Sequence, residues 1–378
     1  MTKTITWPTW LDRGCARRHE RNKPGGLDKR HRKSALSLSK GSMFKVLRRA
    51  GTAMASTSAI FLLFAVPQSL SAADKLVGIH SARVLSQSMP WVATEAGLFK
   101  KYNLDFDLVF IASSPSVTAA MLGGDAEISL GGGEGPIRAY VQGASDFVFV
   151  GGFKNVLTHS ILARPDIKRP ADLRGKKVGI NRVGSNPHYF AVQALRRSGI
   201  DPTEVNFIQS GGAPETLVAL LAGGLDAASL NPPTDAQAIA KGLHYVIFGP
   251  DLRLPYAATV FFTRRSLVAK RQPVVGQFLK AMAEAGKIIH SDKEFVYKVM
   301  GKYLRLSDRK VLDAAYNGEV KVLETKLQMN DEGFQSILDE VSRVDPRAKK
   351  IRPQDLIDRR FLDEMEKSGF FDKLWGKG

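Results

Sequence analysis

The chain has 378 residues, of which 44% are hydrophobic, so its length predicts two or three domains and its composition is sufficient for a buried core. The formal net charge is +18 at pH 7, but residues 1–73 hold 14 Lys and Arg against 3 Asp and Glu, whereas the rest of the chain holds 41 against 34. Because nucleic-acid binding requires a clustered basic surface on the folded part, we expect no nucleic-acid partner.

The N-terminal region has the pattern of a secretory signal peptide that begins at Met43. A basic segment precedes an apolar or small-residue run at 53–66, and small residues stand before Asp74. The run is shorter than the about 20 residues that a membrane-spanning helix needs. We therefore predict that residues 43–73 are a signal peptide, that residues 1–42 are an unstructured or mis-called leader, and that the mature protein is periplasmic.

Cysteine and histidine usage bounds the chemistry of the mature chain. The one cysteine, Cys15, lies in the leader, so we expect no disulfide, no thiolate metal ligand and no lipid-acceptor cysteine in the mature protein. His159 and His188 have no Cys or carboxylate at ligand spacing. The sequence therefore predicts neither a metal site nor a cofactor, and it favours a freely diffusing protein.

Strand and helix patterns alternate through the first part of the mature chain. Apolar runs predict strands at 76–80, 104–112, 126–130 and 147–150, and helical spacing or flanking glycines predict helices at 89–103, 116–122 and 136–142. The connections between these elements are short. This alternation is typical of a mostly parallel sheet that is covered by helices.

The same alternation returns in a second unit. Strands are predicted at 161–164, 177–181, 205–210, 227–230 and 245–248, and helices at 187–198, 214–222 and 234–241. A strand-like run follows Pro255, and residues from 273 onward are mostly helical and amphipathic. We expect these helices to pack on the first unit and ordered strands to join the units as a hinge. The prediction is an α/β protein whose lobe 1 comprises 74–160 plus 255–378 and whose lobe 2 comprises 161–254.

Five segments carry a resemblance to a known family. They read TEAGLFKKYNLDFDLV from Thr94, AAMLGGDAEISLGGG from Ala119, IKRPADLRGKKVGI from Ile167, PETLVALLAGGLDAASLNPP from Pro214 and IDRRFLDEMEKSGFFDKL from Ile357. This ordered set resembles the solute-binding proteins of ABC transporters for aliphatic sulfonates, taurine and nitrate, a family that is similar to the thiamine-pyrimidine synthases. The resemblance implies the type II periplasmic-binding-protein fold, with two α/β lobes, a hinge and a helical C-terminal part.

Polar or glycine-rich residues stand at the carboxyl ends of the predicted strands, where ligands bind in open α/β sheets. The candidate ligand-binding residues of the first unit are Gln87, Ser88, Trp91, Ser113, Ser114, Gly132, Gly133 and Glu134. Those of the second unit are Gly184, Ser185, Asn186, Gly211, Gly212 and Asn231. Because both units contribute, we expect the two sets to face each other across a cleft.

Each candidate also has a purely structural interpretation. Ser185 or Asn186 can cap the helix that follows them, while the free backbone N–H groups at the start of that helix favour an anion. Glu134 can bind an ammonium group of a ligand, or it can pair with Arg138 four residues on. Trp91 can belong to the core, and the glycines can serve tight turns.

The resemblance and the strand-end residues together favour a periplasmic solute-binding protein. It would capture a small, anionic, sulfonate-like organic molecule and deliver it to the membrane permease of an ABC importer, which works with a cytoplasmic ATPase. The resemblance does not identify the ligand, because the family also takes nitrate, pyrimidine precursors and aromatic acids. The alternatives are a sensor module that presents its ligand to a membrane receptor, and an enzyme similar to the pyrimidine synthases. The cysteine-rich signatures of those synthases are missing from the mature sequence.

Overall fold

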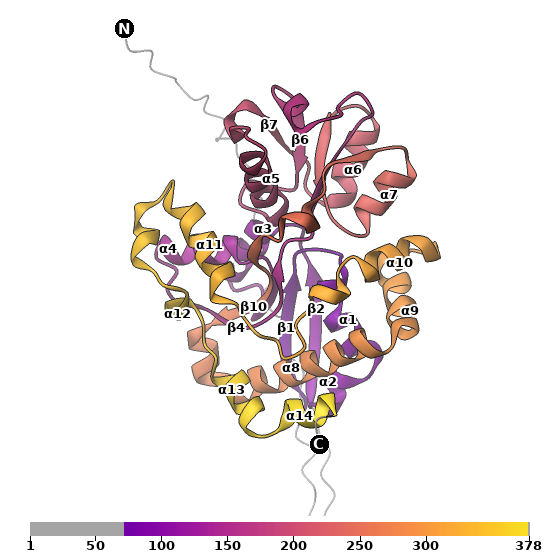
Figure 1. Cartoon of the computed structure of the whole chain (residues 1–378). Coiled ribbons are helices and arrows are strands. Elements are labelled where there is room, and N and C mark those ends of the chain that lie inside the picture. Colours follow the sequence, from indigo (N-terminus) through magenta and orange to yellow (C-terminus); the bar gives the residue numbers. More distant parts are fainter. Residues whose placement is uncertain (1–71, 377–378) are drawn as a thin grey trace, which may run out of the picture. The chain divides into compact units, whose positions relative to one another are not determined.

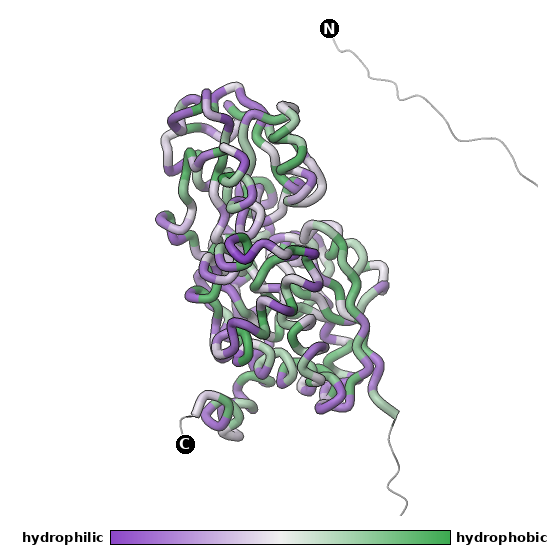
Figure 2. Tube along the Cα trace, turned by 90° about the vertical axis from the view of Figure 1, so that its right-hand side faces the viewer, coloured by the Kyte–Doolittle hydropathy of each residue, from purple (hydrophilic) through white to green (hydrophobic). Residues whose placement is uncertain are grey.

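The computed structural model describes residues 72–376, so the predicted leader and nearly all of the predicted signal peptide lie outside the described residues. Within this range, helices flank two five-stranded sheets (Figure 1). Figure 2 shows hydrophobic and hydrophilic stretches alternating along the chain, as expected for elements with one buried side. No described helix combines the length and the apolar character that crossing a membrane requires.

The first sheet consists of β1 (Asp74–His80), β2 (Leu104–Phe110), β3 (Ile128–Gly131), β4 (Phe147–Val156) and β10 (Pro255–Arg264), in the order β2-β1-β3-β10-β4. β1 pairs in parallel with β2 and β3, whereas β10 is antiparallel to β3 and β4. The helices between these strands are α1 (Met89–Glu95), α2 (Leu98–Lys101), α3 (Ser114–Gly123) and α4 (Glu134–Val141). This sheet and its helices form the first lobe.

The second sheet consists of β5 (Ser160–Ala163), β6 (Lys177–Ile180), β7 (Asn206–Gln209), β8 (Ala227–Leu230) and β9 (His244–Ile247), in the order β7-β6-β8-β5-β9. Its helices are α5 (Asn186–Arg197), α6 (Ala213–Leu221) and α7 (Thr234–Ala240), and together these elements form the second lobe. β5 is antiparallel to both of its neighbours. In each lobe the antiparallel strand is therefore the one that has just crossed from the other lobe.

Two crossing segments, residues 157–159 and 248–254, join the lobes and are bonded to each other. Leu157 N donates to Leu254 O at 3.1 Å, and Gly249 N donates to the Ser160 hydroxyl at 3.0 Å. A Cβ on Gly249 would lie 1.5 Å from the carbonyl oxygen of His159, so only glycine fits there. The expected joint of ordered chain between the units is present.

The C-terminal part is helical, as the sequence predicts. It contains α8 (Arg265–Ser291), α9 (Lys293–Leu304), α10 (Arg309–Asn317), α11 (Asp331–Ser342), α12 (Pro353–Leu356), α13 (Arg360–Lys367) and α14 (Phe370–Trp375). α8 packs on α1 and α11 packs on β10, both in the first lobe. α11 also contacts the second lobe, since Tyr189 of α5 donates to Ser336 O at 3.2 Å. These helices therefore rest on the first lobe and touch the second.

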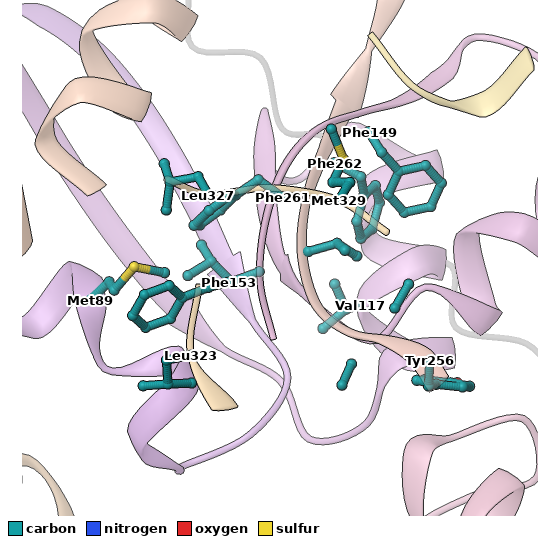
Figure 3. Close-up of a cluster of buried hydrophobic side chains, with 14 of the residues drawn as sticks. Met89, Val117, Phe149, Phe153, Tyr256, Phe261, Phe262, Leu323, Leu327 and Met329 are labelled. Atoms are coloured by element: carbon teal, nitrogen blue, oxygen red, sulfur yellow. The ribbon is translucent and has the colours of Figure 1, made fainter. Parts of the chain in front are cut away.

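The core of the first lobe joins segments that are far apart in the sequence (Figure 3). Phe149 and Phe153 on β4 and Phe261 on β10 are fully or almost fully buried, and Leu327 from the C-terminal part is buried with them. Removing such apolar area from water stabilises the fold by roughly 25 cal/mol per Å². The C-terminal part is thus built into the first lobe.

The predicted elements differ from the observed ones mainly at two places. The predicted helix at 89–103 is divided into α1 and α2, because Gly97 adopts a left-handed φ of 69°. β4 continues to Val156, well beyond the predicted end at 150, because it pairs with β10 along its whole length. This extension places Lys154 inside a buried strand.

Candidate functional site

A cavity lies between the lobes and takes its lining from both of them. It holds about 850 Å³ of non-atom space, part of which is open to solvent. The first lobe contributes residues 81–84, Ser86, Gln87, Phe110, 112–114, Lys154, Ala258 and Thr259, the crossing segment contributes His159, and the second lobe contributes Asn181, 185–187, 212–215, Ser229, Asn231 and Thr234. The cleft expected from the strand ends is therefore present between the two sheets.

Three helices begin at this cavity. Ser113, Ser185 and Gly212 are the N-cap residues of α3, α5 and α6, and all three line it. The N-terminus of an α-helix carries the equivalent of about half a positive charge and unpaired backbone N–H donors. Convergence of three such ends gives the cavity a positive potential that favours an anion.

Several buried polar side chains at the cavity have no hydrogen-bond partner within residues 72–376. The atoms are Ser113 Oγ, His159 Nδ1, Asn181 Oδ1, Asn186 Oδ1 and Ser229 Oγ, and their residues all line the cavity. Most buried polar atoms in folded proteins are paired, so a group of unpaired ones calls for an explanation. Hydrogen bonds to a polar ligand would satisfy all five.

His159 lies in the crossing segment at the edge of the cavity. Its ring stacks against Phe190 of α5, with centroids 6.0 Å apart. Burial lowers the pKa of His159 to about 3, and the nearby Lys154 ammonium lowers it further in the same direction. The imidazole is therefore neutral at physiological pH, and it can donate one hydrogen bond and accept another.

Lys154 is the one buried lysine or arginine in the described part of the chain. Its ammonium forms an ion pair with Glu319 and donates to the Thr158 hydroxyl at 3.2 Å. Glu319 lies between α10 and the segment that runs alongside β4, and its other carboxylate oxygen accepts the backbone N–H of Ser86 at 2.9 Å. The C-terminal part thus contributes a charge next to the cavity.

Asn186 connects the second lobe with the first at the start of α5. Its side-chain nitrogen donates to Ala258 O at 2.9 Å, and since a carbonyl can only accept, this bond fixes the orientation of the amide. The remaining oxygen, Oδ1, is unpaired and the residue lines the cavity. Asn186 can therefore accept a hydrogen bond from a ligand.

Seven of the fourteen candidates from the sequence line the cavity. They are Gln87, Ser113, Ser114, Ser185, Asn186, Gly212 and Asn231. The Gln87 side chain is occupied, since its Oε1 accepts the backbone N–H groups of Ser81 and Ala82 at 2.9 Å each. Gln87 thus holds the loop that forms one wall.

The other seven candidates lie outside the lining: Ser88, Trp91, Gly132, Gly133, Glu134, Gly184 and Gly211. Trp91 packs edge-on against His80 and stacks on Tyr303 at 5.1 Å, which is the core role that the sequence left open. The hydroxyl of Ser88 donates to Leu85 O at 2.7 Å. Both side chains support the loop from behind.

Glu134 and the four glycines have structural roles outside the cavity lining. Glu134 is buried and pairs with Arg138 at 2.9 Å, the pairing that the sequence offered as an alternative to ligand binding. Burial raises the pKa of Glu134, and the Arg138 charge opposes this effect. Gly132 and Gly133 leave room for neighbours, and Gly184 and Gly211 have positive φ in turns.

Sequence reasoning missed ten polar residues of the lining, namely Ser81, Arg83, Ser86, Lys154, His159, Asn181, Glu215, Ser229, Thr234 and Thr259. Asn181 directly follows β6 and Ser229 is near the end of β8, so the rule of strand ends could have included both. Lys154 had one signal in the sequence, a charged side chain directly after the apolar run FVFVGGF that begins at Phe147. No group of three or more described His, Cys, Asp or Glu residues is arranged to hold a metal ion.

Sequence comparisons identify relatives of this chain. The model of the NMT1/THI5-like family matches residues 88–294. A predicted ABC transporter periplasmic binding protein of Brachyspira hyodysenteriae is 29% identical over 164 residues, which is 43% of this chain and 44% of the relative. A predicted binding protein of Brucella abortus is 24% identical over 255 residues, which is 65% of this chain and 76% of the relative. The chain therefore aligns with less than half of the Brachyspira protein.

Solved structures share the fold. The alkanesulfonate-binding protein SsuA of Xanthomonas axonopodis pv. citri, solved with MOPS, matches with a TM-score of 0.65 at 17% identity, covering 75% of this chain and 98% of that one. The aliphatic sulphonate binding protein SsuA of Escherichia coli matches with a TM-score of 0.61 at 21% identity, covering 75% of this chain and 98% of that one. The desulfurization enzyme DszB matches with a TM-score of 0.60 at 14% identity, covering 78% of this chain and 99% of that one. The fold is that of type II periplasmic binding proteins.

Proposed function

The chain belongs to the NMT1/THI5-like family, and we propose that it is a periplasmic solute-binding protein that captures a small anionic organic molecule between its lobes and delivers it to an ABC importer. The observation that carries this proposal is the convergence of three helix N-termini and five unpaired buried polar atoms on one cavity. The helix ends supply a positive potential, and the Ser113 and Ser229 hydroxyls and the His159 ring can donate hydrogen bonds to an anion. The amide oxygens of Asn181 and Asn186 can only accept, so they suit a donor elsewhere on the ligand.

The positions of the unpaired atoms support binding by closure of the lobes. Ser113 belongs to the first lobe, Asn186 and Ser229 belong to the second, and His159 lies in the crossing segment. A ligand that bonds to both halves favours the closed arrangement by the contacts that only this arrangement allows. A micromolar Kd corresponds to about −8.2 kcal/mol, and a few charge-assisted hydrogen bonds of roughly 1.5–3 kcal/mol each are of the right size to supply much of it.

Sulfonates are the first ligand class to test. A sulfonate offers three acceptor oxygens and a single negative charge, which suit helix N–H groups and hydroxyl donors. The two SsuA proteins that share this fold are an alkanesulfonate-binding protein, which was solved with MOPS, and an aliphatic sulphonate binding protein. The acceptor oxygen of Asn186 additionally favours a ligand that carries an N–H or O–H donor.

The direct test is a thermal-shift screen of the purified mature protein against sulfonates, nitrate, aromatic acids, amines and pyrimidines. A ligand at 100 times its Kd stabilises the protein by about 2.7 kcal/mol, which such a screen detects. We expect the hits to be anions, and small-angle scattering should show compaction of the protein when they bind. A screen that returns only cationic ligands contradicts this function.

Delivery to an importer is tested separately. Proteoliposomes that contain a candidate ABC permease with its ATPase should take up the hit from the screen only when the mature protein is added. Ligand binding without uptake, together with activation of a membrane receptor, would instead favour the sensor module. Chemical conversion of the ligand by the protein alone would favour an enzyme.

A further inference from the structure

The ion pair of Lys154 and Glu319 is the centre of a buried network at the base of the cavity. The side chains are 3% and 0% exposed, and Thr158 Oγ1 lies 3.2 Å from the ammonium and 3.1 Å from the carboxylate. The second carboxylate oxygen accepts Ser86 N, and the Ser86 hydroxyl accepts a hydrogen bond from Thr259 at 3.1 Å. Glu319 thus ties the C-terminal part to two segments that line the cavity.

Local structure explains how two residues far apart in sequence come to lie side by side. The chain after Glu319 runs along β4, where Lys154 forms an isolated antiparallel bridge with Leu323. On its other side Lys154 pairs with Thr259 of β10, which also lines the cavity. The backbone of Lys154 is therefore held from both sides, while Glu319 and Thr158 hold its ammonium.

The ammonium has one donor left for a ligand. A lysine ammonium carries three N–H donors, and Glu319 and Thr158 take two of them. Lys154 itself lines the cavity, whereas Glu319 stands behind it. A ligand oxygen at the base of the cavity would thus meet a cation whose charge is already balanced by a carboxylate.

This arrangement bears on the charge of the ligand. A single negative charge gains a hydrogen bond from Lys154 and the potential of the three helix ends. A ligand group bonded to Lys154 would share this ammonium with the Glu319 carboxylate, and a nearby like charge in a buried site strongly opposes a second ionisation of that group. Arg83 also lines the cavity, but it is exposed and its guanidinium lies 4.4 Å from the centre of the Phe110 ring, so solvent screens its charge. No other buried lysine or arginine within residues 72–376 would compensate the second charge.

We infer that the Lys154–Glu319 pair is the specificity element of this cavity, in which Lys154 binds a singly charged anionic group and Glu319 excludes doubly charged ones. This inference rests on the proposed binding of a small anion and adds the charge class to it. The cavity then accepts sulfonates, carboxylates or nitrate and rejects the dianions of phosphonates, phosphate esters and sulfate. Glu319 is a positioning residue for Lys154 and does not itself bind the ligand.

The experiment compares ligands of equal shape and different charge. Dissociation constants are measured by calorimetry at pH 8.5 for ethanesulfonate against ethylphosphonate and for benzenesulfonate against phenylphosphonate. In the wild-type protein we expect the sulfonate of each pair to bind at least about tenfold more tightly. In Glu319→Gln, which keeps an acceptor for Ser86 N, this preference should shrink by about tenfold or more.

Glu324→Gln is the matched control, because Glu324 is a partly exposed carboxylate of the same segment whose side chain accepts a hydrogen bond from Asn155 at 2.8 Å, and it lies outside the cavity lining. It should keep the wild-type preference. If Glu319→Gln does not fold, the double variant Lys154→Met/Glu319→Leu removes the whole pair, which buried sites often tolerate. That variant should bind each sulfonate at least about tenfold more weakly and lose the preference.

The outcomes separate this inference from the proposed function. If none of the four probes and no other anion binds the wild-type protein, the proposed function is wrong and the inference falls with it. If sulfonates bind but phosphonates bind equally well, or if Glu319→Gln leaves the preference unchanged, the protein still binds an anion and only the role of the pair is overturned.

Discussion

A Cβ on Gly132 would lie 1.8 Å from Oδ1 of Asn186, so a first-lobe glycine provides the space that a second-lobe side chain occupies. Asn186 uses this space to donate its hydrogen bond to Ala258 O. The contact joins the loop after β3 to the start of α5 at the wall of the cavity. A side chain at position 132 would therefore collide with Asn186, although Gly132 lies outside the cavity lining.

Replacing Gly132 by Ala should displace the Asn186 side chain and weaken ligand binding by about tenfold, the equivalent of one hydrogen bond of about 1.4 kcal/mol. Gly123→Ala is the control, since its Cβ would have its nearest neighbour at 3.6 Å. Calorimetry with the hit from the ligand screen measures both variants. Equal affinities for the two variants would show that the close approach at Gly132 has no part in binding.

Replacing Ser185 and Asn186 together by Ala should weaken binding clearly while the second lobe stays folded. The change removes the unpaired Asn186 oxygen, the bond to Ala258 and the Ser185 hydroxyl at the start of α5. Asn206→Ala is the matched control, because this exposed asparagine also donates to a carbonyl, Gly175 O at 3.0 Å, away from the cavity. A double variant that binds its ligand as tightly as the wild type contradicts this account of the site.

Stability should decline in mild acid because of His159. Burial lowers the pKa of His159 to about 3 in the folded protein, whereas an unfolded chain has the ordinary value of 6.5. The unfolded state therefore binds a proton at a higher pH than the folded state does. As the pH falls from about 6.5 toward about 3, the free energy of unfolding declines by up to about 1.4 kcal/mol per pH unit because of this residue. Urea unfolding across this range should show a shallower decline for His159→Asn. An unchanged slope would mean that other groups cause the acid sensitivity.

Gly249→Ala should destabilise the joint between the lobes. The added Cβ would lie 1.5 Å from the carbonyl oxygen of His159 in the other crossing segment, so the backbone must move. We expect a loss of about 1–3 kcal/mol in urea unfolding, the usual cost of overpacking. Gly276→Ala is the control, because its Cβ would have ordinary contacts at 3.7 Å and alanine favours a helix. Equal stability of the two variants would show that the crossing segments are not tightly fitted.

The N-terminus of the exported protein should lie close to Asp74. This prediction follows from the signal-peptide pattern at 43–73, which lies almost wholly outside the described residues. Mass spectrometry of the protein recovered from the periplasm of an expressing bacterium measures it. A periplasmic protein that still begins at Met43 would show that the segment is not cleaved.

The sequence by itself determined the alternation of strands and helices and the approximate ends of most of them, because these depend on the local spacing of apolar residues and on nearby glycines and prolines. It also identified Ser113, Ser114, Ser185 and Asn186 as candidate ligand-binding residues, and all four line the cavity. This was possible because ligands bind at the carboxyl ends of the strands in an α/β sheet. The order of the five resembling segments along the chain was sufficient to recognise the family resemblance.

Only the tertiary structure decided which polar residues share the cavity. Lys154 and Glu319 are separated by 165 positions, and nothing in the local pattern of either residue indicates the other. A lysine inside an apolar strand is stable there only because a distant carboxylate balances its charge, and that pairing depends on how the C-terminal part folds against β4. Trp91 lies in the core for the same kind of reason, since Tyr303, more than two hundred residues later, covers its ring. Local periodicity determines the elements, whereas contacts between remote segments determine the chemistry of the cavity.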